Sequence, residues 1–176
     1  MTPLPSPTER LWFRRWTEDD LERARGLWGD PRVTARIARG PLDEAAIRER
    51  LAAEIACERA HGVQYWPIFL RSTGAHAGCC GLRPRDGAPD AGGRVFELGF
   101  HLRADHWGLG LATEAARATL DLAFGPLGAA ALFAGHHPEN DGSRRTLEKL
   151  GFRRSGVERY PATGLLHPSY WLAAGG

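Results

Sequence analysis

Two glycines stand where a strand-like pattern gives way to a helical one, in the stretch Trp107-Gly108-Leu109-Gly110. Residues 96–102 carry an apolar side chain at every second position, which is typical of a strand. From Leu111 onward the apolar residues recur at intervals of three and four, which predicts a helix. A helix that begins at a glycine turn presents unpaired N–H groups and the positive end of its dipole. The chemistry that this stretch predicts is therefore the binding of an anion.

Two common nucleotide-binding loops do not fit this turn. The triphosphate-binding loop needs Lys followed by Ser or Thr after its last glycine, and no such pair follows Gly110. A dinucleotide fingerprint that starts at Gly108 requires a third glycine at position 113, where Thr113 stands. Its strand also normally comes early in the chain. The residues alone leave two interpretations, a site for another phosphate-bearing ligand and a tight structural turn.

A carboxylate lies inside the apolar strand that leads to the glycine turn. Glu97 has Phe96 and Leu98 as neighbours, so burial is expected to raise the pKa of its carboxyl group. A carboxylate with a raised pKa can act as a general base near neutral pH. The alternative is a glutamate at the solvated edge of the sheet, without a chemical role.

The histidines and cysteines do not have the spacing of metal ligands. The pair His136-His137 points to opposite sides of an extended chain, while His101 and His106 lie five residues apart around a turn. No His-x-x-x-His or Cys-x-x-Cys pair occurs in the sequence. We therefore expect no metal at the site, and we expect the pair Cys79-Cys80 to be buried in a strand.

The length and composition indicate a single globular domain. A chain of 176 residues buries about 70% of its unfolded surface, and its net charge of only +2 implies no general affinity for nucleic acid. Three cysteines without paired spacing argue against a disulfide framework and for a reducing compartment. No apolar run approaches the ~20 residues of a membrane span, and the first residues lack the features of a signal peptide. We expect a cytoplasmic protein that binds neither membrane nor nucleic acid.

The periodicity predicts one mixed sheet with few helices, an α/β arrangement. The proline-rich residues 1–8 are expected to form a flexible arm, and residues 9–174 a single domain. Residues 83–93 are a mobile loop by composition, and residues 31–41 are expected to be irregular. Strands are predicted at 11–16, 64–70, 75–82, 96–102, 129–135, 152–160 and 164–172, and helices at 17–28, 42–61, from 111, and at 143–150.

The glycine turn and this order of elements resemble the GNAT superfamily of N-acetyltransferases. The coenzyme A pyrophosphate loop of that family reads Gln/Arg-x-x-Gly-x-Gly/Ala, and the matching residues here are Trp107-Gly108-Leu109-Gly110-Leu111-Ala112. Trp107 replaces the usual Gln or Arg, as is common in the branch that acetylates the N-termini of ribosomal proteins, the Rim type. The resemblance implies the GNAT fold, with a mixed central sheet of about seven strands flanked by four helices.

A second block resembles the same branch. The run from His136 to Phe152 is similar to the Rim-type block in which Asn follows the fifth strand and a basic helix leads to Lys-Leu-Gly-Phe. Tyr65-Trp66 and Glu97-Leu98-Gly99-Phe100 match strands of that branch as well. The resemblance therefore covers almost the whole chain, and it implies an enzyme that uses acetyl-CoA as its cosubstrate.

The resemblance also implies which residues hold acetyl-CoA. Backbone N–H groups of the glycine turn would meet the pyrophosphate, and Asn140 would bind the pantetheine arm. Arg144, Arg145 and Lys149 would meet the 3′-phosphate, although a solvated helix face is an equal alternative. Backbone N–H groups of residues 100–102 would stabilise the oxyanion. The implied donor-binding residues are Phe100, His101, Leu102, Trp107, Gly108, Leu109, Gly110, Leu111, Ala112, Asn140, Arg144 and Arg145.

Acetyl transfer to an amine needs a base for the amine and a proton donor for the leaving thiolate. Glu97 is the candidate base, acting directly or through water. Many GNAT enzymes carry a Tyr at the position of Leu147, so this chain lacks the usual acid. In the Rim branch the substitute corresponds to Ser143, for which a helix N-cap is the alternative role. Because no cysteine lies in the donor motifs, we expect direct attack in a ternary complex.

In this family the acceptor lies between the first two helices and the last hairpin, and Arg36 and Trp66 are the expected contacts. Acidic and basic residues balance in these parts, which disfavours a polycationic acceptor. We expect a peptide or protein N-terminus, or a small amine that carries its own carboxylate. Two alternatives stay open: a non-catalytic acyl-CoA sensor and a transferase for a longer acyl group such as succinyl. Trp12, Trp16 and Trp171 suggest a possible homodimer interface.

Overall fold

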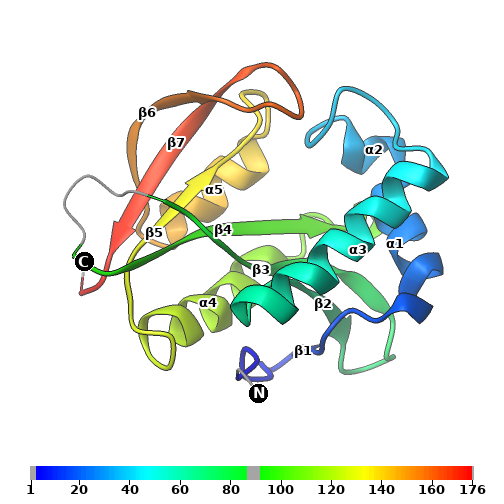
Figure 1. Ribbon diagram of the computed structural model, residues 1–176, viewed down its shortest axis with the longest axis horizontal. Helices are drawn as coiled ribbons and strands as arrows, with labels where there is room; N and C mark the ends of the chain where they lie inside the picture. Colours follow the sequence, from blue (N-terminus) through cyan, green and yellow to red (C-terminus); the bar gives the residue numbers. More distant parts are fainter. Residues whose placement is uncertain (1–2, 87–91, 176) are drawn as a thin grey trace.

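The computed structural model describes residues 3–86 and 92–175, and its strands join in one mixed sheet (Figure 1). The strand order is β1-β2-β3-β4-β5-β7-β6, and every neighbouring pair is antiparallel except β4 and β5. The predicted mixed sheet of seven strands is therefore confirmed. The strands are β1 (Leu11–Phe13), β2 (Tyr65–Leu70), β3 (His76–Pro84), β4 (Arg94–Leu102), β5 (Ala129–Gly135), β6 (Arg153–Arg159) and β7 (Leu166–Ala173).

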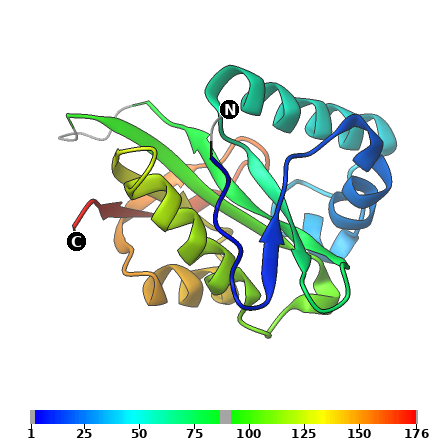
Figure 2. The same ribbon diagram turned by 90° about the horizontal axis from the view of Figure 1, so that it is seen from below.

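Helices cover both faces of this sheet (Figure 2). The helices α4 and α5 lie on one face, and α1 and α3 lie on the other. All four helices that the sequence predicts are present, and two short 3-10 turns, η1 (Glu18–Asp20) and η2 (Ala104–His106), precede α1 and the glycine turn. The four helices are α1 (Leu21–Trp28), α3 (Glu44–His61), α4 (Leu111–Phe124) and α5 (Asp141–Lys149).

The stretch 31–41, expected to be irregular, begins instead with a short helix, α2 (Pro31–Thr34). Its N-cap is Asp30, whose carboxylate accepts a hydrogen bond from the Arg32 N–H at 2.9 Å. Pro31 occupies the first helical position, where its missing N–H costs nothing. The Gly-Asp-Pro segment therefore ends one helix and starts the next.

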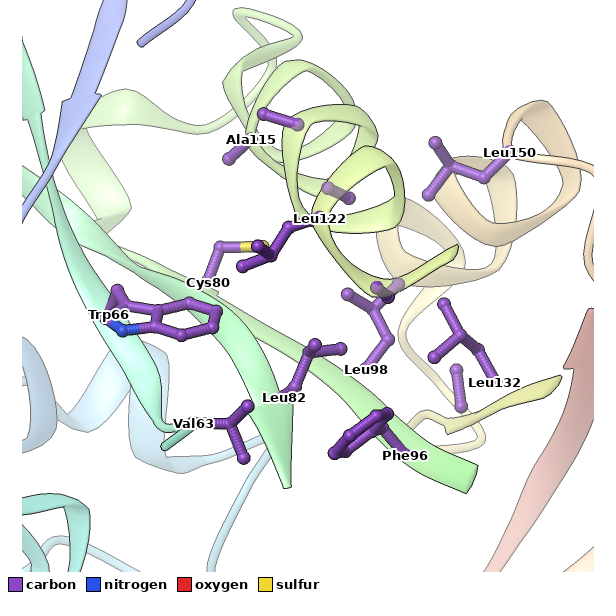
Figure 3. Packing of buried hydrophobic residues seen from close by; sticks show 14 of the residues in the cluster. Val63, Trp66, Cys80, Leu82, Phe96, Leu98, Ala115, Leu122, Leu132 and Leu150 are labelled. Carbon is purple, nitrogen blue, oxygen red and sulfur yellow. The ribbon is translucent and has the colours of Figure 1, made fainter. Parts of the chain in front are cut away.

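Alternation along β2, β3 and β4 divides the core into two layers. Trp66, Leu82 and Leu98 point toward α4 and form the larger layer with it (Figure 3). Tyr65 and Cys79 point the other way and pack with α1 and α3. The predicted burial of the pair Cys79-Cys80 is confirmed, and the two thiols belong to opposite layers because adjacent strand residues face opposite sides.

The parallel strands β4 and β5 pair over the first half of β4 and over most of β5. Their register runs from Arg94 opposite Ala129 to Glu97 opposite Phe133. Beyond that point β4 stays paired with β3 as far as Leu102, whereas β5 stays paired with β7. The C-terminal ends of β4 and β5 therefore diverge, as Figure 1 shows, and the sheet opens between them.

The predicted flexible arm, residues 1–8, contacts the domain over its described part, and residues 1–2 lie outside that part. Leu4 packs against the larger core layer. The Thr8 hydroxyl donates to the Glu114 carboxylate on α4 at 2.6 Å. The described part of the arm is therefore attached to α4, which its composition did not predict.

The predicted mobile loop 83–93 is shorter at its N-terminal end than its composition suggested, and its predicted C-terminal end agrees with the structure. β3 continues to Pro84 and β4 begins at Arg94, while residues 87–91 lie outside the described part of the chain. Across residues 3–86 and 92–175, none of the helices combines the length and the apolar character needed to span a bilayer.

Trp16, one of three tryptophans suggested for a dimer interface, is buried instead. Only 3% of it is exposed, and its indole N–H donates to the Tyr65 carbonyl at 2.7 Å. Its ring also packs against that of Trp28 at 5.4 Å. Trp16 is therefore a core residue, and its place after a terminal strand was no sign of exposure.

Leu132 tests the larger core layer, because it is fully buried on β5. We expect Leu132→Ala to lower the free energy of unfolding by about 2–5 kcal/mol, through lost burial and the cavity left behind. Leu166→Ala on β7 is the matched control, since Leu166 is 53% exposed and the change should stay within about 0.5 kcal/mol. Urea unfolding followed by tryptophan fluorescence measures both, and equal effects would contradict this core.

Candidate functional site

A cleft of about 900 Å³ opens where β4 and β5 separate. The N-termini of α4 and α5 border it, together with α2 and the β6–β7 hairpin. Both predicted catalytic residues, Glu97 and Ser143, line it. Most of the predicted donor-binding residues line it as well, namely Phe100, His101, Leu102, Trp107, Gly108, Gly110, Leu111, Ala112, Asn140 and Arg145.

The glycine turn holds a backbone conformation that ordinary residues rarely adopt. Gly108 and Gly110 have φ values of 76° and 75°, and Gly110 is the N-cap of α4. The first backbone hydrogen bond within the helix runs from the Glu114 N–H to the Gly110 carbonyl at 3.1 Å. The N–H groups of residues 111–113 therefore have no partner inside the helix, and they lie at its positive end beside the cleft.

Leu109 is the residue of the turn that does not line the cleft. Its side chain is 55% exposed. The glycines on either side of it both line the cleft. The turn therefore presents Gly108 and Gly110 to the cleft and Leu109 to the outer surface.

The free half of β4 directs backbone groups into the cleft. Arg103 N–H donates to Ala77 and Arg85 N–H donates to Val95, so the odd-numbered residues of β4 bond to β3. Because bonding direction alternates along an antiparallel ladder, the polar groups of Phe100 and Leu102 face away from β3. They face the gap that β5 has left, and the Leu102 carbonyl accepts there from the Trp107 indole N–H at 3.0 Å.

The start of α5 supplies the opposite side of the cleft. Asn140 is its N-cap, and the Asn140 Oδ1 accepts from the Ser143 N–H at 3.0 Å. The amide nitrogen of Asn140 takes no part in this cap and stays available to a ligand in the cleft. Ser143 lies in the first turn of α5 and lines the cleft at the same end.

Arg144 points away from the cleft, unlike the other basic residues of α5. Its guanidinium pairs with Asp141 at 3.2 Å and with Glu148 at 3.1 Å along the helix surface. Arg145 and Lys149 line the cleft instead. In this structure Arg144 therefore does not join Arg145 and Lys149 at the cleft, as the prediction had it, because the helical repeat turns neighbouring side chains by about 100°.

Glu97 lies at the point where β4 leaves β5. Burial raises the pKa of its carboxyl group above the usual glutamate range, while Arg85 and Arg83 and a hydrogen bond with the Tyr65 hydroxyl act in the opposite direction. The nearest ion-pair contact joins Glu97 Oε2 to the Arg85 guanidinium at 3.6 Å. Arg85 in turn bonds to Glu158 at 2.7 Å, so it is shared between two carboxylates.

Tyr65, and not Trp66, is the residue of β2 that reaches the cleft. Trp66 is fully buried in the layer beneath α4, so its predicted acceptor contact is wrong. Tyr65 lies on the same face as Glu97, and burial raises the pKa of its hydroxyl well above the usual value, which keeps it protonated. The two residues were indistinguishable in sequence, because both are aromatic and a one-residue shift exchanges the faces of a strand.

An ion pair whose carboxylate is fully buried supports Tyr65 from the protein interior. Glu54 on α3 is fully buried, pairs with the Arg83 guanidinium and accepts from the Tyr65 N–H at 2.9 Å. The same guanidinium lies 4.4 Å from the centre of the Tyr65 ring. The backbone and the ring of Tyr65 are therefore both held in place. Tyr65 presents its hydroxyl to Glu97 from a fixed position.

The outer end of the cleft includes three residues that were not among the predicted site residues, namely His137, Tyr160 and His167. The His167 ring lies 4.8 Å from the Tyr160 ring in a tilted arrangement and meets the His137 ring edge-on at 5.6 Å. Burial lowers the pKa of both histidines, so both are neutral near neutral pH. Arg36, predicted to contact the acceptor, does line this end and pairs with Glu139 at 2.9 Å. No sequence pattern pointed to this end of the cleft, because its residues come from three separate segments of the chain.

The described residues include no cluster of three or more His, Cys, Asp or Glu side chains placed to hold a metal ion. His136, for example, is tied to its own surroundings, with Nδ1 2.8 Å from the His137 carbonyl and Nε2 3.2 Å from the Tyr170 hydroxyl.

The cleft fits a long ligand that carries phosphate at one end. No atom lies within 4 Å of the position that a Cβ would take at Gly108, so the turn is open to a close approach. The N–H groups of residues 111–113, with Arg145 and Lys149 nearby, suit phosphate groups. The backbone of Phe100 and Leu102 suits an extended amide-bearing arm. These features together match the parts of coenzyme A.

Comparisons with known proteins agree with this geometry. The acetyltransferase (GNAT) domain family matches residues 10–153. The uncharacterized N-acetyltransferase p20 of Bacillus licheniformis is 29% identical over 153 residues, which is 86% of this chain and 84% of that protein. An acetyltransferase structure from Agrobacterium tumefaciens is 26% identical with a TM-score of 0.78, and the match covers 98% and 95% of the two chains.

The ribosomal L7/L12 acetyltransferase RimL, solved in complex with coenzyme A, has the same fold. Its TM-score is 0.78 at 12% identity, and the match covers 96% of this chain and 97% of that one. The chain therefore belongs to the GNAT family of acetyltransferases. It is an N-acetyltransferase, and the acetyl donor that this family uses is acetyl-CoA.

Glu97→Gln tests the raised pKa of the Glu97 carboxyl group through stability. Because the pKa of Glu97 is raised on folding, the stability it contributes is fully present below its unfolded-state pKa and is lost as pH rises through its higher folded-state pKa. We therefore expect the wild type to lose stability relative to Glu97→Gln across this interval and the difference to level off above it. Urea unfolding at a series of pH values measures this, and a difference that changes in the opposite direction would contradict the raised pKa.

Proposed function

We propose that this protein transfers the acetyl group of acetyl-CoA to the primary amine of a peptide or protein N-terminus, or of a small amine that carries a carboxylate, in the manner of the Rim-type branch. The observation that carries the proposal is the cleft itself. It joins an anion-binding helix start at Gly110 to a half-buried carboxylate, Glu97, across the unpaired half of β4.

Acetyl-CoA supplies an activated thioester and a thiolate leaving group. The chain's N–H groups at the start of α4 hold the pyrophosphate, and Arg145 and Lys149 face the 3′-phosphate. Asn140 uses its free amide nitrogen on the pantetheine arm. The N–H groups that β4 directs into the gap stabilise negative charge on the carbonyl oxygen, because they are already oriented and need no rearrangement.

Glu97 removes the proton of the attacking amine, directly or through water. Its raised pKa makes it a better base than an ordinary glutamate, and the protonated Tyr65 hydroxyl fixes its orientation. An α-amino group has an ordinary pKa of about 7.7–8.0, compared with about 10.4 for lysine, so an N-terminal acceptor demands less of this base. This difference favours an α-amine over a lysine side chain.

The Ser143 hydroxyl, in the first turn of α5, relays a proton to the leaving thiolate and regains one from solvent water. Leu147, where many relatives carry a Tyr, is 1% exposed and cannot take that part. The state of the buried cysteines also agrees with direct attack in a ternary complex. Burial raises the pKa of Cys79 and raises that of Cys80 to about 12, so neither thiol is an available nucleophile.

The charges at the outer end of the cleft argue against a polycationic acceptor. The carboxylates that line this end are paired with arginine: Glu97 and Glu158 with Arg85, and Glu139 with Arg36. A polyamine would therefore have to break ion pairs to find partners. The neutral rings of His137 and His167 suit an uncharged side chain next to the amine.

Thermal unfolding with acetyl-CoA tests the donor. A ligand at 100 times its Kd adds about 2.7 kcal/mol, which should raise the Tm by roughly 5–11 °C for a domain of this size. NAD and ATP serve as controls and should give no shift. A shift with NAD or ATP and none with acetyl-CoA would overturn the donor assignment. Acetyl transfer to a set of N-terminal peptides is then compared with transfer to kanamycin, and preference for kanamycin would overturn the acceptor class.

Single substitutions test the two proton-transfer roles. We expect Glu97→Gln to lower kcat/KM by about 10²–10⁴-fold and Ser143→Ala to lower kcat by at least about tenfold, with little change in the Kd of acetyl-CoA. Glu49→Gln on the exposed face of α3 and Ser72→Ala in the β2–β3 turn are the matched controls. Unchanged turnover in both variants would show that neither role is real. Tight donor binding without turnover on any amine would instead indicate an acyl-CoA sensor.

A further inference from the structure

A single arginine supports the glycine turn from its outer side. The Arg10 Nη1 donates to the Leu109 carbonyl at 2.9 Å. Its Nε donates to Glu114 at 2.6 Å, and its own backbone N–H donates to the same carboxylate at 2.9 Å. Arg10 therefore ties the middle of the turn to the first turn of α4, from a position 99 residues earlier in the chain.

The contact between Arg10 and the Leu109 carbonyl affects the cleft through the geometry of the peptide bond. A trans peptide directs its C=O and its N–H to opposite sides. Arg10 holds the Leu109 carbonyl on the outer surface, where Leu109 is exposed. The N–H of Gly110, in the same peptide plane, is thereby directed to the inner side, and Gly110 lines the cleft. The guanidinium thus orients a donor that it never touches.

The turn needs such support because its own residues do not restrict it. Gly108 and Gly110 both have positive φ, and glycine visits many backbone conformations at little cost. The bonds of the Trp107 indole N–H to Leu102 and of the Glu114 N–H to Gly110 hold the two ends of the turn. The bond from Arg10 holds its middle.

Arg10 also compensates a charge that would oppose an anion. Glu114 lies in the first turn of α4, close to the N–H groups that face the cleft. Although burial acts to raise the pKa of Glu114, hydrogen bonds from Thr8 and Arg10 lower it, so this carboxylate is ionised at neutral pH. Contact with the guanidinium, at 2.6 Å, offsets its negative charge beside the anion site.

We propose that Arg10 is a positioning residue for the donor, which holds the Leu109–Gly110 peptide in the orientation that binds the pyrophosphate. The proposal rests on the donor assignment above. The N-terminal segment then contributes to the affinity for the donor, and it does so only for ligands that carry the pyrophosphate.

Arg10→Met tests the proposal, with Arg48→Met as the matched control. Arg48 is also exposed and pairs with Glu44 on α3, away from the cleft. Titration calorimetry with coenzyme A should show a Kd about tenfold higher for Arg10→Met and unchanged for Arg48→Met, the effect of losing one charge-assisted hydrogen bond. In turnover, kcat/KM should fall about tenfold with acetyl-CoA and stay unchanged with S-acetylpantetheine, which lacks the pyrophosphate.

Further variants separate orientation of the peptide from compensation of charge. In Arg10→Met/Glu114→Gln the unmatched charge is gone but the Leu109 carbonyl is still free, so we expect the weak binding to persist. Recovery of wild-type affinity would overturn the proposal. If Arg10→Met fails to fold, Arg10→Lys replaces it. Lysine keeps the positive charge but cannot donate to Leu109 and Glu114 at the same time as the planar guanidinium does, so Arg10→Lys should also bind coenzyme A more weakly.

The outcomes separate this inference from the donor assignment. A wild type that does not bind coenzyme A would refute the donor assignment itself. A wild type that binds, with Arg10→Met and Arg10→Lys binding equally well, would refute the role of Arg10 alone. Equal losses with acetyl-CoA and S-acetylpantetheine would also refute it, because a general structural effect does not distinguish the two donors.

Discussion

The separation of β4 from β5 is the constraint on which the rest of this structure depends. Two parallel strands that stayed paired to their ends would satisfy each other's backbone groups and leave no cleft. Here β5 stays with β7 after Phe133, and β4 stays with β3 to Leu102. Backbone groups of β4 are left without a strand partner, and such groups need another partner. The cleft places the starts of α4 and α5 on either side of them.

Side chains alternate between the two faces of β2 and β4, and this alternation separates the apolar residues from the polar residues of the cleft. Apolar residues such as Leu98 and Trp66 fill the layer under α4, while Glu97 and Tyr65 share the opposite face. A charge on that face is costly to bury, and the pKa of Glu97 is raised as a result. The fully buried Glu54 with Arg83 holds Tyr65 in place, so the polar groups near the base are ordered by contacts deeper in the protein.

Much of the fold and part of the site could be predicted from the sequence. The order of strands and helices follows from local periodicity, and the glycine turn marks its own place between β4 and α4. Boundaries shifted by a few residues, and α2 was missed because a four-residue helix has too few positions for a period. Trp16 was misplaced because its position in the chain says nothing of what packs over it.

What the sequence by itself determined is therefore local: the types of element, the glycine turn with its helix start, and the candidates Glu97, Asn140 and Ser143. Only the tertiary structure decided which face of β2 meets the cleft, that Arg144 bonds along its helix, and that Arg10 reaches Leu109. The physical reason is that a strand has two faces, which a one-residue shift exchanges. Contacts between residues far apart in the chain, moreover, leave no periodic trace in either segment.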